Sequence, residues 1–509
     1  MVKNALLSCI SLFTINSTFA ETKINVLLNE NNINPYDKNA PSNTSIVIDS
    51  AVFGQLLSIN NNNEIVPELL ENAFYDDNEK EYVLQLKKNI YFHNKRLATA
   101  HDLEFSLLRL FFTKEKSHGR GALNNIYGLE KIEKQGLTKF ISGVVPGVRV
   151  VNDYTVRVKL IAPDPDFLYM LTHSSFSLVP LEELKDNYIE WKTFPIGAGS
   201  FAILAPGYEK GVVKLKKTNA SLKQAPDLIH FYTKNVEQIN YDVSLIKLSE
   251  EKQKKYKTFI SELPVGAFGL TFTNVNPLGN SLEFRQFVQK ALNREELNKK
   301  VFAHTPVYES FPRSSWGNHK LKNPYDPEAA KKLFQSFPKK YQEKEWKVSV
   351  YSSGNEIKGN KKFLLDEIQK QLAEYGFKIT YILFKEQFLP KEIAEQVPFD
   401  IASFQVDKYD HLFKFARLLN SGSDEFVKPL FDRKLEDLYN NALTSETKEQ
   451  KSQIIDELSE YVHEQAYWVP LLERKSVIYY DPKTIETLAH KGEQLNDFFA
   501  SRVVMKNKR

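Results

Sequence analysis

Residues that could carry out catalysis occur in this 509-residue chain, but not at catalytic spacings. His463-Glu464 begins like the zinc-protease motif H-E-x-x-H, yet Tyr467 stands where the second histidine would be. Gly197 to Ala202 carries a degenerate dinucleotide fingerprint, but a strand is predicted after it, whereas that fingerprint needs a helix. The sequence has neither a G-x-S-x-G turn nor a P-loop, and its ten histidines and three methionines form no cluster of metal ligands. We therefore expect no enzyme activity, no cofactor and no metal site.

The N-terminal residues have the pattern of a secretory signal peptide. An early lysine precedes an apolar run from Ala5 to Ile15, and small residues up to Ala20 predict cleavage there, which assigns residues 1–20 to the signal. Leu6 to Cys9 also resembles a lipoprotein cleavage box, but cleavage before Cys9 would leave a leader with almost no apolar core. Cys9 is the only cysteine in the sequence, so the mature chain would contain no disulfide and no thiol nucleophile.

Composition favours a soluble globular protein with more than one domain. The hydrophobic content is 42% and the charged content 26%, and the length exceeds that of one ordinary core. The net charge of +4 arises from 68 basic and 64 acidic residues, which is too balanced to indicate a nucleic-acid partner. No later segment reaches the run of about 18 apolar residues that a membrane span needs. Since no repeat and no long linker is evident, we expect the domains to be interleaved.

The stretch from Tyr82 to Leu110 predicts a strand, a turn and a helix. Apolar residues alternate from Tyr82 to Leu86, as on the half-buried face of a strand. Asn94 to Arg96 supplies a polar turn. Thr99 is then the expected N-cap, and Asp102, three residues later, would complete a capping box.

The other predicted elements alternate between strands and helices, which favours an α/β fold. Asp326-Pro327 is typical of a helix start, and Lys347 to Phe384 predicts a strand–helix–strand unit. Further predicted strands cover Lys23–Leu28, Gly266–Asn274 and Tyr467–Leu471. Further predicted helices cover Ile46–Leu57, Leu282–Lys299, Leu435–Leu443 and Ile454–Glu464. A hairpin is predicted over Val148–Leu160.

Several of these segments resemble one family, the family 5 extracellular solute-binding proteins, which are the peptide- and nickel-binding receptors of ABC importers. The family signature Y-x-F-x-L-R-x-x-V-x-F-H-D-G-x-P-L-T-A-x-D-V is matched in register, although Asn94 and Lys95 replace its Asp-Gly and Leu97 its Pro. The matching signature residues are Leu86-Lys87, Ile90, Phe92-His93, Thr99-Ala100 and Asp102-Leu103, and further matches follow in family order at Asp153–Pro163, Phe194–Phe201, Asn274–Leu297, Tyr325–Leu333 and Ile368–Ile379.

This resemblance implies an α/β fold of two lobes, with a deep interlobe cleft and an extra inserted domain. It assigns residues 21–45, 186–265 and 475–509 to lobe 1, residues 46–185 to the inserted domain and residues 266–474 to lobe 2.

The resemblance also implies ligand-binding residues. Peptide-binding members carry D-x-x-x-x-x-W-x-x-D-Y-x-D/E-P, in which the Asp after Trp pairs with the α-amino group of the peptide. Asp407 matches that Asp and Phe404 stands in place of the Trp, while Tyr409 and Asp410 complete the candidate set. A carboxylate that faces an ammonium group in a closed cleft forms a strong charge-assisted hydrogen bond. The alternative is that Asp407 is a solvated loop carboxylate.

On this basis we expect a monomeric periplasmic receptor of an ABC importer, which binds short peptides and delivers them to an inner-membrane permease. We expect no nucleic-acid partner and no membrane span. The alternatives are a receptor for another solute, such as a nickel complex or haem, a secreted peptidase, and a chaperone-like binding protein.

Overall fold

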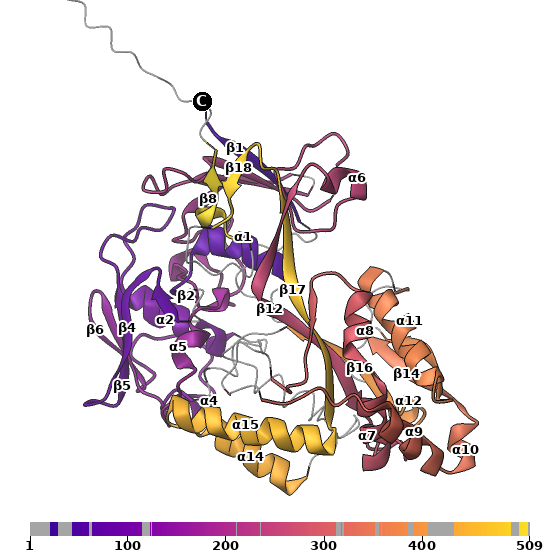
Figure 1. The fold of residues 1–509 in the computed structure, drawn as a ribbon. Coiled ribbons are helices and arrows are strands. Elements are labelled where there is room, and N and C mark those ends of the chain that lie inside the picture. The colour runs from indigo at the N-terminus through magenta and orange to yellow at the C-terminus, as the bar shows by residue number, and fades with distance from the viewer. Residues whose placement is uncertain are drawn as a thin grey trace, which may run out of the picture.

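The computed structural model has two lobes and is an α/β fold, as predicted (Figure 1). It describes all residues except 1–20, 29–42, 61–63, 114–122, 124, 210, 235, 312–316, 318–319, 352–355, 358, 385–390, 406–431, 490–497 and 507–509.

A mixed sheet of 11 strands runs through both lobes. At its centre, β12 (Lys257–Phe272) and β17 (Trp468–Tyr480) pair in antiparallel orientation and reach into both lobes. On the lobe 2 side lie β16 (Phe399–Gln405), β14 (Glu345–Tyr351) and β15 (Lys378–Phe384), with β13 (His304–Pro306) beside β17. On the lobe 1 side lie β11 (Val243–Ser244), β1 (Lys23–Leu27), β10 (Leu228–Tyr232), β9 (Val212–Lys217) and β8 (Phe201–Glu209).

The core of lobe 1 combines distant parts of the chain. The first predicted strand is confirmed as β1, which pairs in parallel with β10. Its Ile24 and Val26 belong to the same apolar cluster as Phe498 and Val503 near the C-terminal end. Short strands β18 (Ile485–Thr487) and β19 (Val504–Met505) pair next to this cluster.

Helix α1 (Asn43–Phe53) contributes its buried face to the lobe 1 core. The prediction that it continues to Leu57 is wrong, because Gly54 adopts a φ of +71°, a left-handed conformation that ends helices. Leu57 instead begins β2 (Leu57–Ile59), which pairs with β3 (Ile65–Pro67). Gly197 and Gly199 pack against the end of α1, where an added Cβ would lie 2.3 Å from a backbone oxygen, and strand β8 follows them. These glycines therefore serve close backbone packing.

A separate antiparallel sheet, in the order β4-β5-β7-β6, forms the unit that we call the inserted domain. Its strands are β4 (Leu70–Asp76), β5 (Glu81–Leu86), β7 (Thr155–Val158) and β6 (Val148–Asn152), and its helices are α2 (Ala100–Phe112), α4 (Leu129–Lys134) and α5 (Phe167–Met170). The predicted hairpin is confirmed as β6 and β7. Phe140, Tyr188 and Trp191 pack against both the core of this unit and the core of lobe 1, so the two form one packed body. The residue boundaries of the domains stay a prediction.

Lobe 2 contains the predicted strand–helix–strand unit, in which α11 (Gly359–Ala373) connects the parallel strands β14 and β15. Asp326 caps α9 (Pro327–Ser336), as predicted, by accepting a hydrogen bond from the Ala329 N–H at 3.0 Å. The predicted helix over Leu282–Lys299 is divided into α7 (Leu282–Ala291) and α8 (Arg294–Lys299). The division arises because Asn293 leaves the helical conformation and caps α8 with its side chain.

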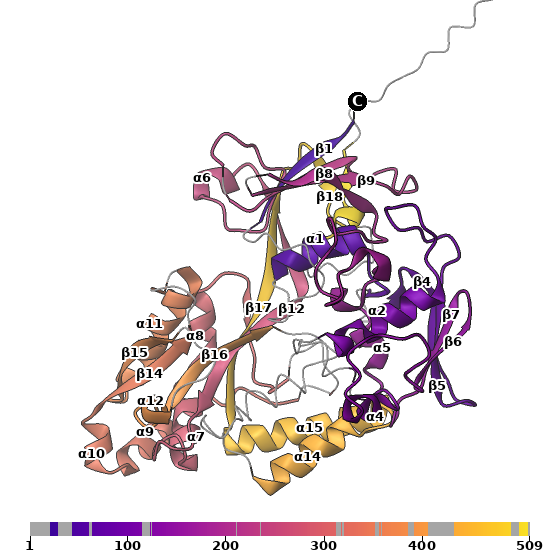
Figure 2. The same ribbon diagram turned by 180° about the vertical axis from the view of Figure 1, so that it is seen from behind.

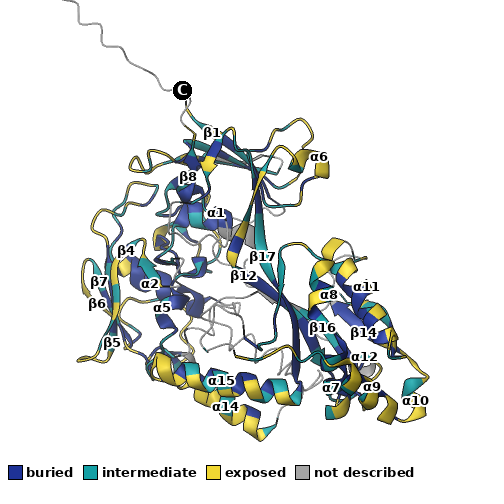
Figure 3. Cartoon of the chain, viewed as in Figure 1, coloured by how far each residue is buried: buried dark blue, intermediate teal, exposed yellow. Residues whose placement is uncertain are grey.

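Two helices near the C-terminal end, α14 (Arg433–Leu443) and α15 (Lys448–Gln465), pack on lobe 2. We call this pair the helical arm. Both helices were predicted but begin earlier than expected, since Asp432 and Thr447 cap them. Figure 2 shows α15 running from lobe 2 to the inserted domain, and Figure 3 shows buried residues on its inner side and exposed residues on its outer side. The remaining short helices are α6 (Glu250–Gln253), α10 (Lys339–Gln342) and α12 (Lys391–Ala394).

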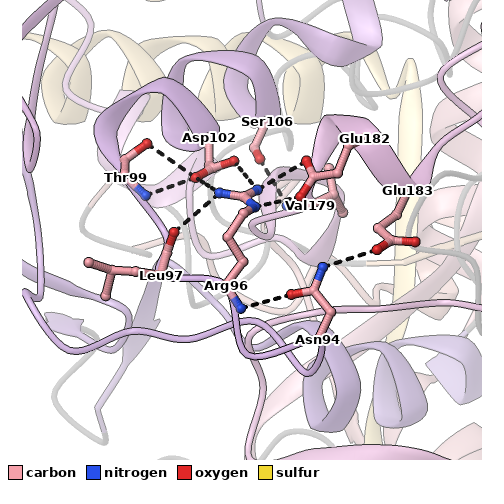
Figure 4. Close-up of polar contacts among 9 residues, drawn as sticks. All are labelled: Asn94, Arg96, Leu97, Thr99, Asp102, Ser106, Val179, Glu182 and Glu183. Atoms are coloured by element: carbon pink, nitrogen blue, oxygen red, sulfur yellow. Dashed lines mark hydrogen bonds and ion pairs between the residues drawn. The ribbon is translucent and has the colours of Figure 1, made fainter.

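Arg96 organises the turn before α2 (Figure 4). Its guanidinium donates two hydrogen bonds to the Asp102 carboxylate, at 2.9 and 2.6 Å, and two to the Glu182 carboxylate, at 2.5 and 3.1 Å. The Thr99 N–H donates to Asp102 at 2.8 Å, which confirms the predicted capping interaction. Between Asn94 and Arg96, Lys95 adopts a φ of +71°. The family signature has glycine at this position, the residue that adopts this conformation without strain.

We expect Arg96→Met to lower the free energy of unfolding by about 1–3 kcal/mol, because the Asp102 carboxylate, which is 9% exposed, would lose its bidentate partner. Arg96→Lys should recover only part of this loss, since lysine lacks the planar fork. Urea unfolding measures both. Lys185→Met is the control: it removes an ion pair to Glu190 in which both side chains are more than half exposed, and should have an effect of less than about 1 kcal/mol. Equal losses in the two methionine variants would contradict the prediction.

Candidate functional site

Strand β16 ends one residue after Phe404, the first of the predicted ligand-binding residues. The backbone of Phe404 pairs with that of Ala267 in β12, and Gln405, the last residue of the strand, pairs with Gly266. Asp407, Tyr409 and Asp410 lie outside the described residues. The segment that contains them therefore follows directly after the strand that lies beside β12.

The pairing of β12 with β17 is irregular close to that point. The register shifts between Ile260 and Pro264 and again between Pro264 and Gly266. Pro264 has no N–H to donate to the ladder, and register shifts of this kind allow a strand pair to bend. Toward lobe 1, β17 pairs with β11, and toward lobe 2, β12 pairs with β16. The irregular pairing thus lies between the parts of these two strands that belong to different lobes.

Asp400 is a partly buried carboxylate that was not among the predicted site residues. Its neighbours Phe399 and Ile401 lie in the apolar core of lobe 2, so Asp400 projects from the opposite face of the sheet. It pairs in register with Thr271 of β12 and with Ser349 of β14. Within the described part of the chain, its Oδ1 atom is buried and has no hydrogen-bond partner.

Burial alone raises the pKa of Asp400 to about 8, so the side chain is a neutral carboxylic acid at neutral pH. A neutral acid can donate or accept a hydrogen bond, and a cation brought to it would favour its ionised form. The sequence signal that could have indicated it is a single aspartate within the otherwise uncharged strand Phe-Asp-Ile-Ala-Ser-Phe.

Other chemically capable side chains serve structural roles. The buried His93 ring nitrogen Nε2 lies 3.0 Å from the Gly199 carbonyl oxygen, which joins the turn before α2 to the loop before β8. Burial lowers the pKa of His93, which keeps the ring neutral.

Across the described ranges, no three His, Cys, Asp or Glu side chains gather as a potential metal site. A groove of about 460 Å³ lies on the inserted domain, away from β16, and is lined by Glu71, Gln85, Leu86, Lys88, Asn152, Asp153, Tyr154 and Thr155.

Ionisation of Asp400 is predicted to oppose folding, because its folded pKa of about 8 exceeds the value of about 4 for an unfolded aspartate. The wild type should therefore lose stability from this group as the pH rises from about 4 to about 8, by at most about 1.4 kcal/mol per pH unit. Asp400→Asn cannot ionise and should lack this loss. Denaturant unfolding at pH 5 and pH 7.5 measures the change, with the exposed Asp366→Asn as control. A difference between variant and wild type that stays constant over this range would contradict the prediction.

Comparison with known proteins places these features in a family. The model of the bacterial extracellular solute-binding proteins, family 5, middle region, matches residues 64–425. "Heme-binding protein A" of Haemophilus influenzae is 22% identical over 448 residues, covering 80% of this chain and 79% of that protein. "Probable di/tripeptide-binding protein 5" of Pseudomonas aeruginosa is 24% identical over 458 residues, covering 80% and 81%.

A solved structure supports the fold over nearly the whole chain. The ABC transporter substrate-binding protein CtaP of Listeria monocytogenes has a TM-score of 0.77 at 16% identity, with 96% of this chain and 100% of that chain covered. Within the described residues, no helix is both long and apolar enough to cross a membrane. Since the family model matches more than half of the sequence, the chain belongs to the family 5 bacterial extracellular solute-binding proteins.

Proposed function

We propose that this protein is a periplasmic receptor of an ABC importer, which binds short peptides between its lobes and delivers them to an inner-membrane permease. It is exported by the signal in residues 1–20, acts as a monomer and releases its ligand chemically unchanged. The observation that carries this proposal is the position of β16: it belongs to lobe 2, and its last residue pairs with Gly266, beside the irregular section of β12 that lies between the lobes.

The charges available at this position suit an amino group. Asp407 binds the α-amino end of the peptide, while Phe404, Tyr409 and Asp410 contact its first residues. Asp400, on the strand that leads to this segment, adds a neutral carboxylic acid whose buried Oδ1 atom has no partner among the described residues. Backbone groups of the lobes then bind the peptide main chain in the way that a sheet accepts an added strand.

Haem is the second candidate ligand, because one relative is named a haem-binding protein. Haem presents two propionate groups, which are anions, and aspartates repel anions at short range. A site whose proposed anchors are Asp407 and Asp410 therefore favours a peptide amino group over haem. The relative named a di/tripeptide-binding protein supports the same choice.

We expect the protein, purified without denaturation, to release short peptides when it is unfolded in acid. Mass spectrometry of the released material identifies them, and absorption near 400 nm reports haem. Recovery of haem in a one-to-one ratio, with no peptide, would contradict the peptide assignment. Peptides incubated with the protein should be recovered intact, whereas cleavage would overturn the role as a receptor.

Asp407→Asn should weaken binding of the co-purified peptide by about 10- to 100-fold, because an amide cannot offer the ammonium a charge-assisted hydrogen bond. Isothermal titration calorimetry measures the dissociation constant. N-acetylation of the peptide should cause a similar loss with the wild type and little further loss with the variant, since both changes remove the same contact. Asp366→Asn, an exposed position on α11, is the control. Unchanged affinity in Asp407→Asn would contradict the anchor.

A further inference from the structure

The helical arm is fixed to lobe 2 by an apolar contact. Leu435 and Ala442 of α14 pack together with Ile455, Leu458 and Val462 of α15. The same cluster contains Trp468 at the start of β17, which places the arm firmly on lobe 2. From this base α15 extends to the inserted domain, as both ribbon views show (Figures 1 and 2).

At the far end of α15, Lys451 forms ion pairs with the inserted domain. Its Nζ atom lies 3.4 Å from Asp164 Oδ1, and it also pairs with Asp166. The side chains of Lys451 and Asp166 are only 3% and 6% exposed, so this contact is shielded from water and salt. Burial lowers the pKa of Lys451, but the two aspartates outweigh it and raise the pKa overall, which keeps the ammonium charged.

The receiving side is held rigidly. The Asp166 N–H donates to Asp164 Oδ1 at 2.9 Å, and the Tyr82 hydroxyl donates to the Asp164 carbonyl oxygen at 2.6 Å. The Tyr82 ring lies 4.6 Å from that of Phe167, between centroids, at the start of α5. The two carboxylates are therefore tied to strand β5 and move with the inserted domain.

The two sides of this contact share no apolar core. The cluster that fixes the arm contains no residue of the inserted domain, and the core of the inserted domain contains none of the arm, among the residues that the structure describes. The inserted domain and lobe 1, in contrast, share aromatic side chains. The described structure thus consists of two bodies, lobe 1 with the inserted domain and lobe 2 with the arm. They are joined by β12 and β17 and meet again at Lys451.

We propose that Lys451, Asp164 and Asp166 form a releasable latch, which holds the two bodies together in the arrangement described here and must separate when the bodies move apart. A buried ion pair is suited to this role, because its Coulomb attraction is largely offset by the desolvation of its charges, which water restores on opening. An apolar contact would expose its surface to water on opening, and hydration would not offset the cost of that exposure. This proposal rests on the contacts between the two bodies and does not depend on the identity of the ligand.

The test measures the separation of the two bodies without any ligand. Cys9 is the only cysteine, so in a Cys9→Ser background two introduced cysteines can be spin-labelled selectively. Asn78→Cys lies in the exposed turn between β4 and β5, and Lys340→Cys lies on α10 of lobe 2. Pulsed electron paramagnetic resonance gives the distribution of distances between the labels.

Lys451→Met should increase the fraction of molecules with widely separated labels by at least about tenfold relative to the wild-type latch. The reason is that it leaves two buried carboxylates without their cation. Asp166→Asn should also increase it, and the double variant should add little to the larger single effect, since all three disrupt one contact. Lys362→Met is the matched control: it removes a lysine–aspartate pair within α11 alone and should leave the distances unchanged.

Circular dichroism verifies that each variant is folded, and Asp164→Asn, at a partly exposed position, provides a milder change if Lys451→Met does not fold. Distance distributions that superimpose for wild type, Lys451→Met, Asp166→Asn and Asp164→Asn would overturn the latch. An equally large increase in the fraction of widely separated labels in Lys362→Met would also overturn the latch. Neither result would affect the proposed peptide binding, which is measured separately.

Discussion

The antiparallel pairing of β12 with β17 is the constraint on which the rest of the structure depends. These strands are the centre of the large sheet, so each lobe completes its own part of the sheet against them. Backbone hydrogen bonds fix the register between β12 and β17. The register shifts around Pro264 interrupt this pairing between the parts of the strands that belong to different lobes. The position of β16 and the reach of α15 both follow from this arrangement.

Local interactions explain which parts of the fold were predictable from the sequence. The cap of α2 by Asp102, the cap of α9 by Asp326 and the β6–β7 hairpin each involve residues a few positions apart. The errors were also local: a left-handed glycine shortens α1, and Asn293 begins a new helix where a continuous one was expected. The turn around Lys95 keeps a glycine-type conformation although the glycine is absent. Arg96 and its carboxylate partners supply contacts that can hold this strained residue in place.

The candidate site was less predictable, because its chemistry depends on burial and on distant contacts. The family resemblance indicated Phe404 and Asp407, but only β16 pairing places Phe404 beside β12. A single aspartate in an uncharged strand draws attention to Asp400, but only the folded structure shows that its Oδ1 atom is buried without a partner among the described residues. Lys451 is one of many lysines in the sequence, and its pairing with Asp164, 287 positions away, is a property of the folded chain. Burial and long-range pairing thus separate these residues from ordinary surface charges.

The core of lobe 1 has a consequence for the order in which the chain can fold during synthesis. Its first strand supplies Ile24 and Val26, while Phe498 and Val503 complete the same cluster. Lobe 1 therefore cannot finish its core until Phe498 and Val503 have left the ribosome. The β14–α11–β15 unit has its partners close in sequence and can form much earlier. A nascent chain of this protein exposes the apolar side chains of β1 until Phe498 and Val503 emerge, and during that interval it is a substrate for holding chaperones and for aggregation.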